Sequence, residues 1–437
     1  MMRPELLKNN IPSGWLVKTL ADLGEFKTGG VDKKIKQDEK PVKLVNYMDA
    51  YKRRFIDNSI KFMEVTASDS EIKIAQVKVG DMLFTPSSET PDDIGHSAVV
   101  AEDLPNTLFS YHLTRLRFNE EYDNKIDLNF RAYFCNSRDV LKQFEKMSVG
   151  ATRYTISKGK FESIQVLIPE SKTEQKKIAE ILGTVDEDIA KTQEVIEATE
   201  KLKRGLMQQL FTRGIGHTKF KETKIGQIPE GWRVASLQTM LDKGLITSHL
   251  DGNHGELYPK SSEFINEGVP YLSANCIEDG HVNFAKAKFL SPDRASKFLK
   301  GVAINGDILF AHNATVGPVA ILNMEEKYVI LSTTLTYYRC NSSKLVPSYL
   351  RYFMESPLFS NQYGRVMAQT TRNQVPITIQ RTFFHALPAY KEQEEIAEIL
   401  SAVDEKISVN KKLKEKLTLF KKGLMQDLLS GKVRVKV

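Results

Sequence analysis

Two places in this 437-residue sequence hold acidic residues and a lysine at the loose spacing of a magnesium-dependent nuclease. In such a site two carboxylates bind Mg²⁺ and a lysine assists the attacking water. The residues are Pro91-Asp92 with Asp123 and Lys125, and Pro292-Asp293 with Glu325 and Lys327. The two matches fall on opposite sides of corresponding strand-like segments. We therefore interpret them as coincidence and expect neither a catalytic residue nor a metal site in this chain.

Other catalytic signatures do not occur in the sequence. It contains no GxxxxGK[ST], HExxH, GxSxG or GxGxxG segment, and none of the glycine-rich FxGxG or [ND]PP[YF] segments typical of methyltransferases. The three cysteines lie far apart, and the eight histidines show no ligand spacing stronger than His249 with His254. The sequence therefore predicts that the chain itself binds no cofactor.

Loops rich in small hydrogen-bonding residues are better candidates for a binding site. Such a loop follows each of two GD[MI]LF segments, at residues 85–97 and 311–317. Another precedes each of two long helical segments, at residues 150–160 and 369–377. Side chains of these types contact the phosphates and the base edges of DNA. A formal net charge of +7 permits DNA binding through local patches without requiring it.

The residues that we expect to contact DNA come from these loops, from a basic cluster near Tyr47 and Tyr51, and from the histidine pair. In the first half of the chain they are Lys33, Lys34, Arg53, Arg54, Ser87, Ser88, His96, Arg153, Tyr154, Lys158 and Lys160. In the second half they are His249, His254, His312, Asn313, Thr315, Thr371, Arg372, Asn373 and Gln374.

The elements that must position these loops form an internal repeat. EQKKIAEILGTVDE (174–187) returns as EQEEIAEILSAVDE (392–405), and GDMLF (80–84) returns as GDILF (306–310). An IPSGW segment near the N-terminus also returns as IPEGW. The offsets of 218, 226 and 217 residues show that the halves share a frame altered by insertions and deletions. Each half is expected to hold a variable α+β domain followed by a similar long helix.

Each long helix carries an apolar stripe with alternating spacings of four and three residues, which is typical of a coiled-coil seam. In the first helix the stripe slips after Ile189 and resumes with Val195. Gly205 and Gly423 interrupt the helices at equivalent places, where we expect a close helix approach or a hinge. The alternative is that each stripe packs only on its own domain. The residues expected to pair the helices are Ile178, Leu182, Val185, Ile189, Leu202, Leu206, Ile396, Leu400, Val403, Ile407, Leu417 and Leu424.

Four segments follow from this organisation. They are a first domain at 1–173, a helix at 174–216, a second domain at 217–390 and a helix at 391–437. No stretch of the sequence is apolar over the length of a membrane span, and the first residues lack the apolar core of a secretory signal. The sequence therefore predicts a cytoplasmic protein.

The order and duplication of these motifs, together with TTRNQVPI and a proline shortly before EQxxIAEIL, resemble the DNA-specificity subunit of type I restriction-modification enzymes. The resemblance covers about residues 11–430. It implies two target-recognition domains that each read half of a bipartite double-stranded DNA target, joined by an antiparallel pair of helices that sets the spacer between the halves. It also implies a non-catalytic scaffold for two methyltransferase subunits, which bind S-adenosylmethionine, and two restriction subunits, which are motor nucleases using ATP and Mg²⁺.

Two other functions stay open at this point. A self-sufficient DNA methyltransferase or nuclease would show methyl transfer or Mg²⁺-dependent cleavage as the purified chain. A coiled-coil protein adaptor would show no salt-dependent affinity for DNA.

Overall fold

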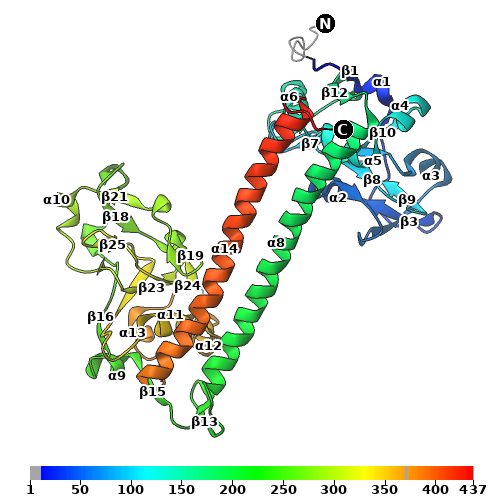
Figure 1. Ribbon diagram of the computed structural model, residues 1–437. Helices are drawn as coiled ribbons and strands as arrows, with labels where there is room; N and C mark the ends of the chain where they lie inside the picture. Colours follow the sequence, from blue (N-terminus) through cyan, green and yellow to red (C-terminus); the bar gives the residue numbers. More distant parts are fainter. Residues whose placement is uncertain (1–10, 370–372, 437) are drawn as a thin grey trace. The chain divides into compact units, whose positions relative to one another are not determined.

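The computed structural model describes residues 11–369 and 373–436, which belong to two compact units. The first unit comprises Met1–Gln193 and Lys412–Val437, and the second comprises Glu194–Lys411. Each unit contains one domain of mixed helices and strands and half of each long helix (Figure 1). The predicted α+β class and the tandem repeat are confirmed. The compact units divide the chain within the long helices, so the four segment boundaries stay a prediction.

The first domain is organised around a five-stranded and a three-stranded sheet. The larger has the order β2 (Gly24–Lys27), β10 (Thr114–Phe118), β6 (Met82–Phe84), β8 (Ser97–Val100) and β4 (Phe55–Ile56). The smaller has the order β5 (Met63–Ala67), β3 (Lys40–Val45) and β9 (Thr107–Phe109), and β1 (Trp15–Thr19) pairs with β12 (Gln165–Pro169). The helices are α1 (Leu20–Leu23), α2 (Tyr47–Lys52), α3 (Asp69–Ala75), α4 (Glu120–Lys125), α5 (Leu128–Phe134), α6 (Arg138–Met147) and α7 (Lys158–Glu162).

The second domain has a four-stranded and a five-stranded sheet. Their orders are β16 (Ile246–Asp251), β26 (Leu335–Cys340), β23 (Ile308–Asn313), β24 (Thr315–Ile321), and β17 (Phe264–Ile265), β21 (Lys288–Leu290), β18 (Val269–Leu272), β25 (Val329–Leu331), β22 (Val302–Ala303). Three further pairs are β13 (Phe220–Thr223) with β14 (Gly226–Pro229), β15 (Arg233–Ser236) with β27 (Phe384–Leu387), and β19 (Ile277–Glu278) with β20 (His281–Val282). The helices are α9 (Leu237–Asp242), α10 (Pro292–Ala295), α11 (Pro347–Glu355), α12 (Pro357–Met367) and α13 (Ile377–Gln380).

A buried ion pair explains the aspartate of both GD[MI]LF segments. The Asp81 carboxylate accepts two hydrogen bonds from the Arg117 guanidinium, at 2.8 and 2.7 Å. Asp307 accepts two from Arg339, at 2.9 and 2.7 Å. Each carboxylate also accepts the backbone N–H of the residue three positions before it. In both domains the aspartate thus connects the turn that precedes a central strand with the strand next to it in the sheet.

The segment 128–147 forms the two helices α5 and α6. The break lies at Asn136, whose side chain is buried and makes three hydrogen bonds to Ser97 and one to the carbonyl of Ala132. Asparagine and serine compete with the helical backbone for hydrogen bonds, which favours a break here.

The long helices α8 (Lys172–Arg213) and α14 (Tyr390–Leu429) pair antiparallel, as expected. In the first unit the ammonium of Lys421 pairs with the carboxylate of Asp186. In the second unit Lys203 pairs with Asp404, with 2.7 Å between nitrogen and oxygen. Early α8 therefore lies beside late α14 in the first unit, and late α8 beside early α14 in the second (Figure 1).

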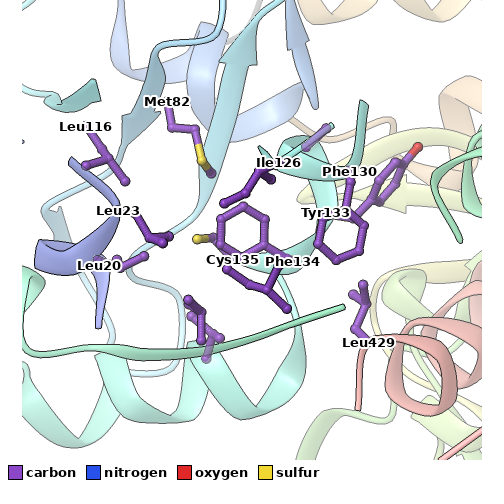
Figure 2. Packing of buried hydrophobic residues seen from close by; sticks show 14 of the residues in the cluster. Leu20, Leu23, Met82, Leu116, Ile126, Phe130, Tyr133, Phe134, Cys135 and Leu429 are labelled. Carbon is purple, nitrogen blue, oxygen red and sulfur yellow. The ribbon is translucent and has the colours of Figure 1, made fainter. Parts of the chain in front are cut away.

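Domain residues extend the helix packing in both units. In the first unit the end of α14 enters the domain core, and Figure 2 shows Leu429 on the side of this core that holds the rings of Phe130 and Tyr133. In the second unit Phe211 of α8 packs against Tyr349 and Phe353 of α11. Within each unit the helix seam thus continues into the domain core. Each long helix therefore packs both on the other long helix and on the domain of that unit.

The helix seam continues without the predicted slip. Its central positions in α8 are the buried Thr192, Ile196 and Thr199, followed by Lys203. These positions continue the alternating spacing of four and three residues that begins at Ile178. In α14 the equivalent central positions are Asn410, Lys414, Leu417 and Lys421. Leu202 is 54% exposed and does not belong to the seam. The prediction for Leu202 is wrong because it follows apolar residues alone, whereas the centre of this seam is largely polar.

The two helix glycines do not mark a close helix approach. A Cβ atom added at Gly205 or at Gly423 would have no heavy atom within 4 Å. Both glycines are exposed. The expectation of close packing is therefore wrong at both positions.

A glutamate anchors the first turn of each long helix. Glu174 is buried and accepts hydrogen bonds of 2.6 and 2.9 Å from Arg434, which follows α14. Glu392 accepts hydrogen bonds of 2.9 Å each from Trp232 and His217, which follow α8. The segment after each helix thus returns a donor to the start of the other helix within the same unit.

Candidate nucleic-acid interface

The two polar loops of each half are joined by backbone pairing. In the first domain β7 (Ser87–Ser88) pairs antiparallel with β11 (Tyr154–Thr155). In the second domain Asn313 forms a bridge with Gln374, and the backbone N–H of Ala314 donates to the carbonyl of Asn373. The fold therefore brings together the segment after each GD[MI]LF strand and the segment before each long helix.

A cavity of about 630 Å³ opens beside this pairing in the first domain. Four of the residues predicted to bind DNA line it, namely Lys33, Ser87, Ser88 and Arg153. The remaining lining residues are Tyr47, Tyr51, Glu89, Thr90, Asp93, His112 and Thr152. The cavity thus combines two cations, several hydroxyl groups, carboxylates and two aromatic rings.

Hydrogen bonds hold the polar groups of this cavity in place. The Arg153 Nη2 donates to the Ser87 Oγ at 3.0 Å, and the Tyr47 hydroxyl donates to the Ser87 carbonyl at 2.9 Å. The Tyr51 hydroxyl donates to Asp93, at 2.9 Å to the nearer carboxylate oxygen. The ring of Tyr51 stacks on that of Tyr47, with 5.8 Å between centroids. The lining is therefore ordered by contacts among its own residues.

The pKa shifts around the cavity follow from burial and neighbouring charge. Burial lowers the pKa of His112, and the positive charges of Lys33 and Arg153 lower it further. The hydrogen bond to Asp93 is the main cause that raises the pKa of Tyr51. Burial lowers the pKa of His96, although Asp93 opposes this at a distance of 2.9 Å. The His112 imidazole and the Tyr51 phenol that line the cavity are therefore neutral at neutral pH.

The other predicted residues of the first domain lie outside the cavity. Lys34 and Arg53 are exposed, and Tyr154 lies opposite Ser88 in the strand pair. Lys158 pairs with Glu162 at 3.6 Å, and the Lys160 ammonium donates to the carbonyl of Met147 at 2.6 Å.

Arg54 differs from the other predicted cations of this domain. Burial lowers its pKa, while the charges of Asp186 and Tyr133 raise it, which places the guanidinium toward α8 and α5. Arg54 is half-buried, and its contact with DNA stays a prediction.

The three predicted histidines of the second domain are buried. His249 contacts Gln380 at 3.1 Å, His254 contacts the carbonyl of Leu331 at 2.6 Å, and His312 contacts the carbonyl of Val375 at 3.0 Å. Burial lowers the pKa of each of them, to about 3 for His249. An imidazole enclosed in this way has no face open to a duplex. The prediction that His249, His254 and His312 contact DNA is therefore corrected.

The remaining predictions in the second domain stay at the surface. Thr315 and Asn373 are exposed, and Asn313 and Gln374 are half-buried. Thr371 and Arg372 lie outside the described residues.

Asp123 and Lys125 of the first nuclease-like match have structural partners. Asp123 accepts a hydrogen bond of 2.7 Å from the buried Arg131, and Lys125 pairs with Glu121 at 2.8 Å. Within residues 11–369 and 373–436, no three His, Cys, Asp or Glu side chains are grouped closely enough to hold a metal ion. Over the same residues, none of the helices has the length and apolar character that crossing a membrane requires.

Asp93 and His112 are cavity residues that the sequence did not single out. Asp93 lies in the polar loop 85–97, so a search for acceptors as well as donors in that loop would have found it. His112 lies far from both loops in the chain, and no local pattern marks it. Its place in the cavity depends on the tertiary fold alone.

Comparison with known proteins identifies similar chains. The family model described as "Type I restriction modification DNA specificity domain" matches twice, at residues 12–200 and 232–419. The MjaVIII type I restriction enzyme specificity subunit of Methanocaldococcus jannaschii is 32% identical over 286 residues, which is 64% of this chain and 65% of that protein. A putative MjaX specificity subunit of the same organism is 27% identical over 434 residues, covering 98% of this chain and 95% of that protein.

Solved structures show a similar fold. The S subunit of a type I restriction-modification system from M. genitalium matches with a TM-score of 0.56 at 17% identity, over 97% of each chain. A chain from a study of complex assembly and conformational transition of the type I R-M system matches with a TM-score of 0.59 at 18% identity, over 97% of this chain and 100% of that one.

Proposed function

Because this chain belongs to the family of type I restriction-modification DNA specificity proteins, we propose that it recognises a bipartite duplex DNA sequence, with one half-site read by each domain. The observation that carries this proposal is the repeated pairing of two polar loops, β7 with β11 in the first domain and Asn313 with Gln374 in the second. Equivalent loop pairs on two diverged domains suit two different half-sites. Side chains such as Ser, Asn and Arg can read base edges from such loops.

Selection from randomised duplex DNA tests this proposal. The wild-type chain is expected to enrich two blocks of defined bases separated by an undefined spacer. Exchange of residues 1–170 with those of a relative is expected to change one block only. A change in the spacer with both blocks intact would contradict the assignment of one half-site to each domain.

The proposed role is that of a non-catalytic scaffold. Two modification subunits would supply methyl transfer with S-adenosylmethionine, and two restriction subunits would supply the motor and nuclease activity with ATP and Mg²⁺. An assay of the purified chain for methyl transfer and for Mg²⁺-dependent cleavage separates this role from a self-sufficient enzyme. Activity of the chain alone in either assay would overturn it.

An outer apolar stripe on each long helix supports the binding of two identical partners. Val195 and Leu202 of α8 are 40% and 54% exposed, and Leu413 and Phe420 of α14 are 44% and 57% exposed. Each pair is separated by seven residues, and the pairs occupy equivalent positions of the repeat. Two copies of one partner could therefore bind equivalent surfaces.

Stoichiometry of the complex tests these surfaces. The variant Leu202→Glu is expected to retain one modification subunit, as is Phe420→Glu, whereas the double variant retains none. Lys201→Ala, at an exposed position next to Leu202, is the control and should retain two. Two bound subunits on the double variant would rule out this docking surface.

A further inference from the structure

We propose that the cavity of the first domain reads a G·C base pair, and that Arg153 donates two hydrogen bonds to the guanine of this pair. The inference rests on the proposed function and adds a base and a residue to it. The major-groove edge of guanine offers two acceptors, O6 and N7, which match the donor geometry of an arginine. The cavity would therefore be a specificity-determining site for the first half-site.

The contacts of Arg153 favour reading of a base. Its Nη2 donates to Ser87 Oγ at 3.0 Å, and Ser87 is buried and held by the β7–β11 pairing and by the hydroxyl of Tyr47. A guanidinium has five N–H donors, and this bond uses one of them. An arginine tethered at one nitrogen loses less side-chain freedom when it binds, and its plane is already oriented. Ser87 is thus a positioning residue for Arg153.

The charges of the cavity select the kind of ligand. Lys33 and Arg153 lie close enough to lower the pKa of His112 between them, so this side of the cavity is positive and offers donors. Asp93 and Glu89 line the same cavity and offer acceptors. Carboxylates repel a phosphate, whereas an acidic side chain can accept a hydrogen bond from the N4 amino group of cytosine. Donors and acceptors together therefore match a G·C edge better than they match the DNA backbone.

Selection from randomised duplex DNA with full-length variants tests the inference. Arg153→Ala is expected to lower the preference for guanine at one position of one block by roughly 5- to 150-fold, the discrimination of one bidentate contact. Arg153→Lys keeps the charge but not the paired donors, so it should lose the same preference while retaining most of the total affinity. Ser87→Ala should reduce the preference less than Arg153→Ala does. Arg138→Ala, an exposed arginine outside the cavity, is the control and should change no base preference.

The possible results separate this inference from the proposed function. A wild-type chain that enriches no sequence would overturn both. A wild-type chain that enriches two blocks, with an Arg153→Ala variant that enriches the same bases, would overturn the cavity assignment alone. A uniform loss of affinity in Arg153→Ala, with a smaller salt dependence and unchanged base preference, would identify a phosphate contact and also overturn it.

Discussion

At the scale of single residues, the buried histidines of the second domain have a consequence for stability. His385 packs among the rings of Phe353, Phe359 and Tyr338, and burial lowers its pKa to about 4. Burial also lowers the pKa of His249 to about 3. Each imidazole is therefore neutral in the folded chain at a pH where it takes up a proton once the chain unfolds.

The second unit is accordingly expected to lose stability as the pH falls from about 6.5 toward 4. Because the unfolded state binds more protons in this window, each of the two histidines lowers the free energy of unfolding by up to about 1.4 kcal/mol per pH unit. The chain has two tryptophans, Trp15 in the first unit and Trp232 in the second, so a Trp15→Phe background reports on the second unit alone. Urea unfolding followed by Trp232 fluorescence measures the effect. His385→Leu should flatten the pH dependence, and an unchanged slope would refute the assignment.

Single residues also show where sequence-based reasoning ends. Ser87, Ser88 and Arg153 are predicted from residue types typical of DNA-binding loops, and they line one cavity, whereas their contact with DNA stays a prediction. The histidines have the same polar character, but the fold buries them, and a residue type does not reveal its burial. The sequence places Tyr47 and Tyr51 beside basic residues, whereas the place of His112 in the cavity depends on a distant segment of the chain.

At the scale of elements, the long helices could be predicted in position and pairing but not in the middle of their seam. Ile178, Leu182 and Val185 of the predicted stripe are buried, whereas their individual contacts with α14 stay a prediction. Beyond Ile189 the apolar Val195 and Leu202 lie on the exposed face, whereas three of the four inward positions are polar, at Thr192, Thr199 and Lys203. A heptad repeat continued from Ile178 through polar as well as apolar residues predicts the seam positions that the structure shows.

The exposed glycines of these helices lead to a stability prediction. Gly205→Ala and Gly423→Ala should each raise the free energy of unfolding of their unit by about 0.5–1 kcal/mol, because alanine restricts the unfolded chain and meets no neighbour. Urea unfolding followed by Trp232 for the first variant and by Trp15 for the second measures this.

Gly431→Ala provides the opposite control. Gly431 has a φ angle of +69°, and an added Cβ would collide with Pro12, so alanine should destabilise the first unit. A Gly205→Ala or Gly423→Ala chain that is less stable than the wild-type chain would contradict this prediction. It would mean that the helix itself requires glycine at that position.

At the scale of the whole molecule, the duplication could be predicted from repeated motifs, and several contacts described above recur in both copies. The GD[MI]LF ion pairs, the anchored glutamates and the Asp–Lys pairs of the seam all occur twice. What differs between the copies is the content of the polar loops and the sheets that carry them. This is the arrangement expected of a constant frame that presents two different recognition surfaces.

We propose that the paired helices set the distance between the two half-sites. One added helical turn after Ile189 is expected to lengthen the spacer. The pairing of the two helices also defines an insertion that is matched in both of them. Since Lys421 pairs with Asp186 and the helices are antiparallel, Ile189 lies opposite Thr418. Seven residues inserted after Ile189, matched by seven after Leu417, would add one heptad to both helices and preserve the seam.

The most direct measurement is selection from randomised duplex DNA with this doubly extended chain. One heptad adds about 10 Å of helix, so the undefined spacer should lengthen by about three base pairs while both blocks keep their bases. Seven residues inserted instead after Asp103, in an exposed turn of the first domain, should leave the spacer unchanged. An extended chain that enriches both blocks at the wild-type spacing would contradict the claim that the helices set it.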